Sequence, residues 1–150
     1  MRTLFRVGAI LFHEGKLVTT KMKKRGKEYH VVPGGGVESH ETLYEALRRE
    51  IQEELNIEIH SFKLIYIREL NIKDQGRGAE FYFYIDKYYG IPKKGYDPEN
   101  KEAILDEVCF LDLNDLKSYT LFPTQLADVL AEDAPSKFSE FRHLGLHNYP

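Results

Sequence analysis

Glutamates are concentrated in the stretch ETLYEALRREIQEE, residues 41–54, which holds five of them in fourteen residues. Glu50, Glu53 and Glu54 are spaced by three and four positions, so on a helix they lie on one face as neighbours. Like charges about 5 to 6 Å apart repel by roughly 3 kcal/mol at an effective dielectric of ~20. A divalent cation reverses the sign of that energy, and carboxylate oxygens are the ligands that Mg²⁺ prefers. The spacing therefore predicts a metal site.

The last two glutamates stand where a helix tolerates negative charge least. Asn56 predicts a left-handed helix end, so Glu53 and Glu54 belong to the final turn, beside unpaired carbonyls and the negative end of the macrodipole. A charge run on a helix usually means only a solvated face, and for the triplet alone this alternative stays open. The glycines at 34–36, directly before the helix, favour a site because glycine permits close backbone approach.

The acidic helix is predicted to begin near residue 42. Thr42 with Glu45 three positions later forms a capping box, which satisfies two backbone donors at the helix start. At roughly 100° per residue, one flank of the helix collects four side chains that are predicted to face the core. These four side chains are Tyr44, Leu47, Ile51 and Leu55.

Short apolar or alternating runs, bounded by Gly and Pro, predict the other elements. The predicted strands are 3–12, 17–22, 28–33, 57–70, 79–89 and 103–113, and a second helix opened by Pro123 is predicted at 123–132. The strands at 57–70 and 79–89 are expected to pair. Residues 21–27 form a predicted basic loop, which either approaches substrate phosphates or serves solubility. The pattern favours an α/β fold, a mixed β-sheet with flanking helices.

Composition limits the classes of protein that fit. A chain of 150 residues with 42% hydrophobic content matches one domain, predicted over 1–150. The net charge of −3 argues against a surface that neutralises duplex nucleic acid. Cys109 is the only cysteine, which excludes an internal disulfide, and no apolar run is long enough for a membrane span. We therefore expect a cytoplasmic protein with no membrane partner.

The acidic stretch resembles the signature of the Nudix hydrolases, G-x5-E-x7-R-E-U-x-E-E-x-G-U, where U is aliphatic. Eight of its nine fixed positions are met over residues 35–57. They are Gly35, Glu41, Arg49, Glu50, Ile51, Glu53, Glu54 and Ile57. The departure is Asn56 in place of the last glycine, and asparagine is the residue that best replaces glycine in a left-handed cap.

This resemblance implies an α/β/α sandwich that hydrolyses a nucleoside diphosphate linked to another group, with Mg²⁺ or Mn²⁺ as cofactor. By position, Glu53 and Glu54 are the principal metal ligands, and the carbonyl of Gly34 adds another. Glu50 binds metal or acts as general base. Arg49 orients Glu50, and Glu41 bridges back to the arginine, while Gly35 forms part of the loop.

The resemblance also implies a further acidic ligand from a late strand or loop. The candidates are Glu99, Glu102, Asp106 and Glu107, and we favour Glu102. His143 and His147 carry only a weak metal signal because Gly145 lies between them. The substrate is a small nucleotide or nucleotide conjugate, with a lean toward nucleoside triphosphates, and a homodimer is left open.

Two other functions on the same fold compete with hydrolysis. A nucleotide-binding regulator would be favoured by loss of one of the three clustered glutamates, and none is lost. An isomerase needs a catalytic cysteine in the site, whereas Cys109 falls in a late strand.

Overall fold

The computed structural model describes residues 4–93 and 105–149. In chain order the strands and helices are β1 (Leu4–His13), β2 (Lys16–Lys24), β3 (Lys27–Val31), β4 (Gly34–Gly36), α1 (Leu43–Leu55), β5 (Glu58–Ile72), β6 (Gly76–Tyr89), β7 (Leu105–Leu111), β8 (Leu121–Phe122), α2 (Gln125–Asp133) and β9 (Arg142–Tyr149). Two short 3₁₀ segments, Leu113–Ser118 and Ala134–Ser136, flank β8 and α2. No helix within the described ranges has the length and apolar character needed to cross a bilayer.

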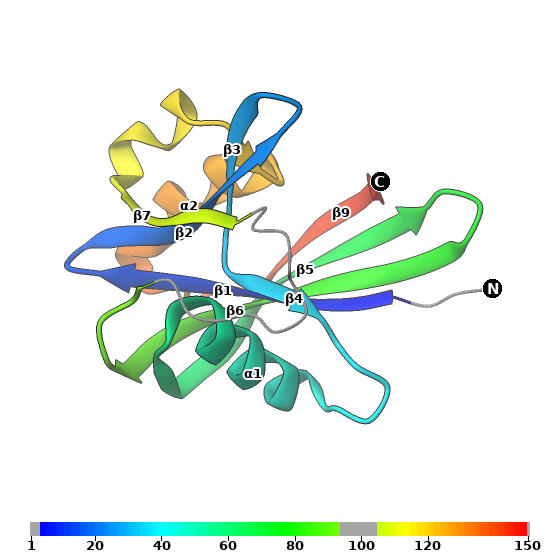
Figure 1. Ribbon diagram of the computed structural model, residues 1–150, viewed down its shortest axis with the longest axis horizontal. Coiled ribbons are helices and arrows are strands. Elements are labelled where there is room, and N and C mark those ends of the chain that lie inside the picture. Colours follow the sequence, from blue (N-terminus) through cyan, green and yellow to red (C-terminus); the bar gives the residue numbers. More distant parts are fainter. Residues whose placement is uncertain (1–3, 94–104, 150) are drawn as a thin grey trace.

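The strands form one mixed sheet in the order β8-β3-β2-β1-β6-β5-β9, with β4 paired to β1 and β7 paired to β2. The pairs β1–β6, β3–β8 and β5–β9 are parallel, and the long β5–β6 hairpin is antiparallel, as predicted. Helix α1 covers one face and α2 the other (Figure 1). The predicted α/β sandwich with a mixed sheet is thereby confirmed.

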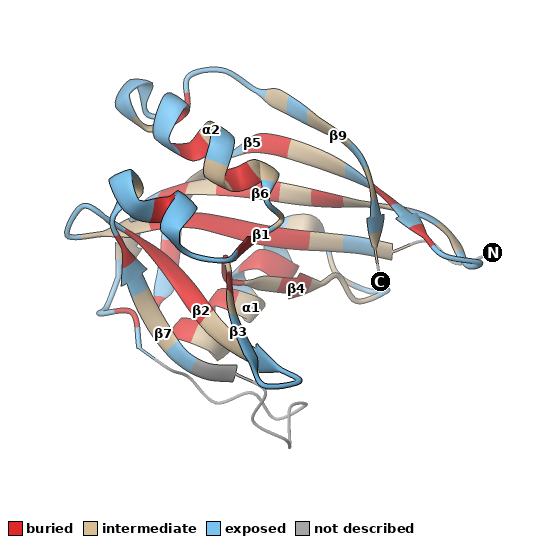
Figure 2. Cartoon of the chain, turned by 90° about the horizontal axis from the view of Figure 1, so that it is seen from above, coloured by how far each residue is buried: buried red, intermediate tan, exposed pale blue. Residues whose placement is uncertain are grey.

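Strand β1 divides the buried apolar residues between the two faces, because successive side chains on a strand point to opposite sides. Val7, Ala9 and Leu11 are fully buried in the core under α1. Ile10 belongs to a second core, which includes Leu126 and Leu130 of α2. Figure 2 shows this burial concentrated along the centre of the sheet and on the inner faces of both helices. The sheet therefore holds α1 rigidly against β1.

The predicted start and end of α1 are both confirmed. The Thr42 hydroxyl accepts from the Glu45 N–H at 3.1 Å, and the Glu45 carboxylate accepts from the Thr42 N–H at 3.2 Å. Asn56 closes the helix in the left-handed conformation, with φ of 54°. Tyr44 was predicted wrongly as a core residue, since it is 53% exposed. It lies in the first turn, where its ring forms T-shaped pairs with Phe62 and Phe83.

Residues 21–27 form a hairpin rather than the predicted basic loop. Strand β2 continues to Lys24 and β3 starts at Lys27, joined by Arg25 and Gly26 with φ of 52° and 78°. Two positive φ values in a two-residue turn match the twist of a hairpin, which explains why the strands extend so far. Lys21 forms ion pairs with Glu28 and Glu107 of the flanking strands.

Strand β9 has no counterpart among the predicted elements, because residues 133–150 show little apolar pattern. It pairs with β5 from Tyr66 to Ile72. Its first residue, Arg142, donates two hydrogen bonds to Asp133 at 2.7 and 2.6 Å, and Asp133 also accepts from the buried hydroxyl of Tyr66 at 2.7 Å. This link through Asp133 ties β9 to α2 and to the sheet.

Candidate active site

The short strand β4 brings the glycines alongside α1. Hydrogen bonds from Ala9 N–H to Pro33 O and from Val37 N–H to Phe5 O, both 2.8 Å, set its register on β1. Hydrogen-bonded positions alternate along an antiparallel pair, so Gly34 and Gly36 direct their backbone groups away from β1. The Gly34 N–H donates to Glu54 Oε2 at 2.7 Å, and the Gly36 carbonyl accepts from an Arg49 terminal nitrogen at 3.1 Å. Both contacts cross from β4 to the helix.

Gly34 and Gly35 are needed for space rather than for unusual backbone angles. A Cβ on Gly35 would lie 2.3 Å from the carboxylate carbon of Glu50, and one on Gly34 would lie 2.0 Å from the carbonyl oxygen of Val7. A Cβ on Gly36 would meet nothing within 4 Å. None of the three has a positive φ. The absent side chain of Gly35 therefore forms the cradle into which the Glu50 carboxylate fits.

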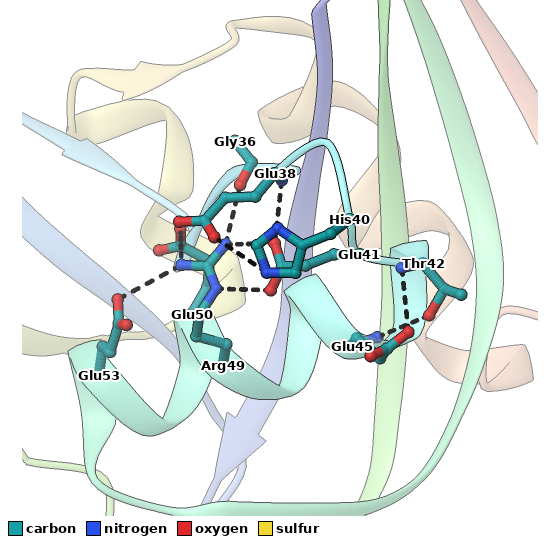
Figure 3. A network of polar contacts seen from close by, with 9 residues as sticks. All are labelled: Gly36, Glu38, His40, Glu41, Thr42, Glu45, Arg49, Glu50 and Glu53. Carbon is teal, nitrogen blue, oxygen red and sulfur yellow. Dashed lines mark hydrogen bonds and ion pairs between the residues drawn. The ribbon is translucent and has the colours of Figure 1, made fainter.

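Arg49 joins the acidic residues into one network (Figure 3). Its Nε and a terminal nitrogen donate to the two oxygens of Glu41 at 2.7 and 2.8 Å, a bidentate arrangement that fixes the guanidinium plane. The other terminal nitrogen donates to Glu50 Oε1 at 2.9 Å and lies 3.5 Å from Glu53 Oε2. Arg49 thus contacts Glu41, Glu50 and Glu53 from one position.

The Glu41–Arg49 pair is electrostatically fixed. Hydrogen bonds from Arg49 lower the pKa of Glu41 to about 2, assisted by the Glu38 N–H, which donates to its carboxylate at 2.9 Å. The Glu41 carboxylate in turn raises the pKa of Arg49 above its usual value, and Glu50 adds to the effect. The side chain of Glu41 is only 7% exposed, so water screens this pair weakly. Both groups stay charged throughout the neutral range.

Two of the three glutamates predicted as metal ligands lie against β4, Glu50 at Gly35 and Glu54 at Gly34. Glu53 lies beside Arg49. Within residues 4–93 and 105–149, no group of three or more His, Cys, Asp or Glu side chains is gathered closely enough to hold a metal ion. The donor set nevertheless fits Mg²⁺, since it consists of hard carboxylate oxygens beside a backbone edge, with the Glu50 carboxylate lying where a Cβ on Gly35 would stand.

The late acidic candidates do not join this group of glutamates in the described part of the chain. Glu107 lies on β7, where its carboxylate forms an ion pair with Lys21. Glu99 and Glu102, the latter our preferred ligand, lie outside the described residues. Asp106 belongs to β7, but its side chain is not among the described parts of the structure.

The two histidines with a weak metal signal lie on strand β9 rather than on a helix. His143 hydrogen-bonds Glu69 at 2.9 Å, and His147 stands opposite Leu70 in the β5–β9 pair. The Gly36 carbonyl and the Glu38 N–H belong to the Arg49 network but were not predicted. They are backbone groups, for which a sequence carries no residue-type signal.

A protein-family model described as the NUDIX domain matches residues 3–132. The chain belongs to the Nudix family. This membership confirms the resemblance drawn from residues 35–57, and it supports the predicted enzyme class, a hydrolase acting on phosphoric anhydride bonds. No curated protein matches the chain.

Several solved structures share the fold at low sequence identity. The E. coli ORF135 protein is 17% identical with a TM-score of 0.74, over 93% of this chain and 96% of its own. The mutator MutT protein of Bacillus halodurans is 18% identical with a TM-score of 0.70, over 97% and 90%. The MutT Nudix hydrolase of Burkholderia pseudomallei is 21% identical with a TM-score of 0.67, over 85% and 96%.

Proposed function

We propose that this Nudix protein hydrolyses a nucleoside diphosphate linked to another group, with Mg²⁺ or Mn²⁺ held by Glu53 and Glu54. The observation that carries the proposal is the Arg49 network. A bidentate ion pair with Glu41 and a hydrogen bond to the Gly36 carbonyl fix Arg49 in a position where it contacts further acidic side chains. A protein selected only for stability gains nothing from packing like charges at the negative end of a helix. A catalytic metal site explains the arrangement.

In the proposed mechanism, a bound divalent cation would supply charge neutralisation for the phosphoryl oxygens and a lowered pKa for an attacking water. Glu53 and Glu54 would hold it, together with the carbonyl of Gly34. Glu54 already accepts from the Gly34 N–H, so its carboxylate is oriented toward the same backbone edge.

We assign Glu50 the role of general base. Its carboxylate is confined between Gly35 and Arg49, which fixes where its oxygens lie. Glu41 in turn holds Arg49, so Glu41 influences the position of Glu50 through the arginine. A carboxylate in this position would accept a proton from a water that attacks phosphorus.

We favour nucleoside triphosphates as substrates, and we propose that the whole chain acts as one cytoplasmic domain. The MutT proteins that share this fold are consistent with a small nucleotide substrate. The groups that recognise the base and sugar belong to loops and are not identified by the glutamate site.

The test is a panel of nucleotides and nucleotide conjugates, assayed with Mg²⁺ for release of phosphate or pyrophosphate. We expect Glu53→Gln and Glu54→Gln to lose at least ~10²-fold in rate, the scale of one electrostatic contact to a transition state. Glu45→Gln is the matched control, because it removes a charge from the same helix while glutamine still completes the capping box. Tight nucleotide binding without any product would instead identify a nucleotide-binding regulator.

A further inference from the structure

A buried polar cluster lies on the face of the sheet opposite α1, formed by Arg6 of β1, Arg68 of β5, and Glu80 and Tyr82 of β6. Arg6 Nε donates to Glu80 Oε2 at 3.2 Å, and Arg68 donates to Glu80 Oε1 at 2.7 Å. The Tyr82 hydroxyl donates to the same oxygen. Glu80 therefore serves three donors at once, and its side chain is only 11% exposed.

The cluster carries more positive than negative charge. Two guanidinium groups share one carboxylate, and burial raises the pKa of Tyr82 well above its usual value, so the phenol stays neutral. Arg68 Nε, and Nδ1 of the neighbouring His147, are buried without a hydrogen-bond partner among the described residues. A buried charge without a counter-charge is costly. The cluster therefore favours binding of an anion at the point where it reaches solvent.

Arg6 is the member of the cluster that reaches solvent. Its side chain is 28% exposed, and its guanidinium carbon lies 5.6 Å from the centre of the Tyr149 ring. Its bond to Glu80 uses Nε, so that contact leaves the two terminal nitrogens for another partner. The aromatic face of Tyr149 holds the guanidinium in place without consuming a hydrogen-bond donor.

Arg6 lines an open groove of about 710 Å³ at this end of the sheet. The groove is bounded by β1, β4, the turn between β5 and β6, and the last strand, with lining residues Leu4, Arg6, Gly36, Ile72, Lys73, Asp74, Gln75 and Tyr149. The end of β9 reaches the groove through Tyr149, whose ring lies beside Arg6 of β1. Lys73 and Asp74 add one charge of each sign, so the cluster and the groove lining together hold three cationic side chains, Arg6, Arg68 and Lys73, and two carboxylates.

The groove borders the glutamate site through Gly36. Gly36 stands directly opposite Arg6 in the β1–β4 register, and its carbonyl accepts from Arg49. A Cβ built on Gly36 meets nothing within 4 Å, so the strand is bare on the groove side. The charge of Glu50 also contributes to raising the pKa of Arg6. A ligand at β4 can therefore contact the glutamates on one side and Arg6 on the other.

We propose that this groove is a phosphate-binding subsite, which receives through Arg6 and Lys73 a phosphate group of the substrate beyond the bond that is cleaved. The part that concerns the substrate rests on the proposed function. Phosphate suits the groove because a guanidinium presents paired donors to its oxygens and because the buried cluster lacks one negative charge.

Binding of inorganic pyrophosphate to the wild-type protein in EDTA, measured by calorimetry, tests the groove without any metal or turnover. We expect Lys73→Ala to weaken binding by ~5-fold, the effect of one exposed ion pair. Arg6→Lys should weaken it by at least ~10-fold, since lysine cannot form paired bonds to phosphate. Lys63→Ala is the control, because this lysine lies on β5 but does not line the groove. Absent binding, or equal binding in all four proteins, overturns the subsite.

Steady-state kinetics with Mg²⁺ then distinguish a substrate phosphate from free phosphate. We expect Lys73→Ala to raise KM for a nucleoside triphosphate by ~5-fold with kcat unchanged, and to leave KM for the corresponding diphosphate unchanged. Unchanged KM for every substrate, despite weaker pyrophosphate binding, overturns the assignment to substrate. A third result separates the two proposals. If Lys73→Ala weakens pyrophosphate binding but the wild-type protein hydrolyses no nucleotide, the phosphate site is supported and the proposed function is contradicted.

Discussion

Replacing Gly35 by alanine perturbs the candidate site through one added methyl group. The new Cβ would lie 2.3 Å from the carboxylate carbon of Glu50, whereas ordinary contacts begin at 3.4 Å. Either the carboxylate or strand β4 must therefore move by about 1.1 Å, the difference between these distances. Glu50 is also bonded to Arg49, so the displacement passes into the whole network.

A misplacement of about 1 Å at a reacting group costs ~10²-fold in rate. We therefore expect Gly35→Ala to lose ~10²-fold in kcat/KM for the best nucleotide of the panel, assayed with saturating Mg²⁺. Circular dichroism should show an intact fold, because the new methyl group meets the flexible end of the Glu50 side chain rather than backbone.

Gly36→Ala is the matched comparison on the adjacent residue. Its Cβ meets nothing within 4 Å, its φ is not positive, and its carbonyl remains available to Arg49. We expect an effect of at most about 0.5 kcal/mol, or roughly twofold. The reasoning is refuted if Gly35→Ala keeps activity within a factor of about two, or if the two variants lose activity equally.

Two further predictions concern the stability of the helix and its network. The pKa of Glu41 is lowered to about 2 by Arg49, so its contribution to stability is complete above its ordinary value of 4.5 and is lost as the pH falls toward about 2. Urea unfolding at pH 5 and pH 3 should therefore show a smaller loss for Glu41→Gln, which cannot titrate, than for the wild type, and parallel losses would contradict the pairing. Thr42→Ala should cost ~1 kcal/mol by removing the helix cap, whereas Thr42→Ser should cost much less. Equal destabilisation by both would show that the hydroxyl is not what stabilises the helix start.

The parts of the fold that the sequence predicted are those controlled by neighbouring residues. The limits of α1 follow from Thr42, Glu45 and Asn56, all of which act within one turn of their own position. The β5–β6 pair follows from apolar patterning around a turn. Strand β9 could not be predicted in this way, since it is held by pairing with β5 and by Arg142 bound to Asp133. Tyr44 shows the same limit. Its position on the helix predicted that it faces the core, but the helical pattern does not reveal whether the sheet extends far enough to cover it.

The candidate site divides along the same line. Its acidic side chains were predictable because helical spacing brings them together, and the structure shows the predicted contacts from Arg49 to Glu41 and Glu50. The catalytic roles of these residues stay predictions. The Gly36 carbonyl and the Arg6 cluster depend on the register between β1, β4 and β6, which only the folded chain defines.

The central claim is that Glu53 and Glu54 are placed on α1 to hold a divalent cation. Calorimetric titration of the protein with Mg²⁺ and with Mn²⁺, with and without nucleotide, measures this directly. We predict saturable uptake that Glu53→Gln and Glu54→Gln weaken by at least ~10-fold, the usual scale for an altered metal-site residue, while Glu45→Gln binds like the wild type. Absence of uptake, or equal uptake by all four proteins, would contradict the claim.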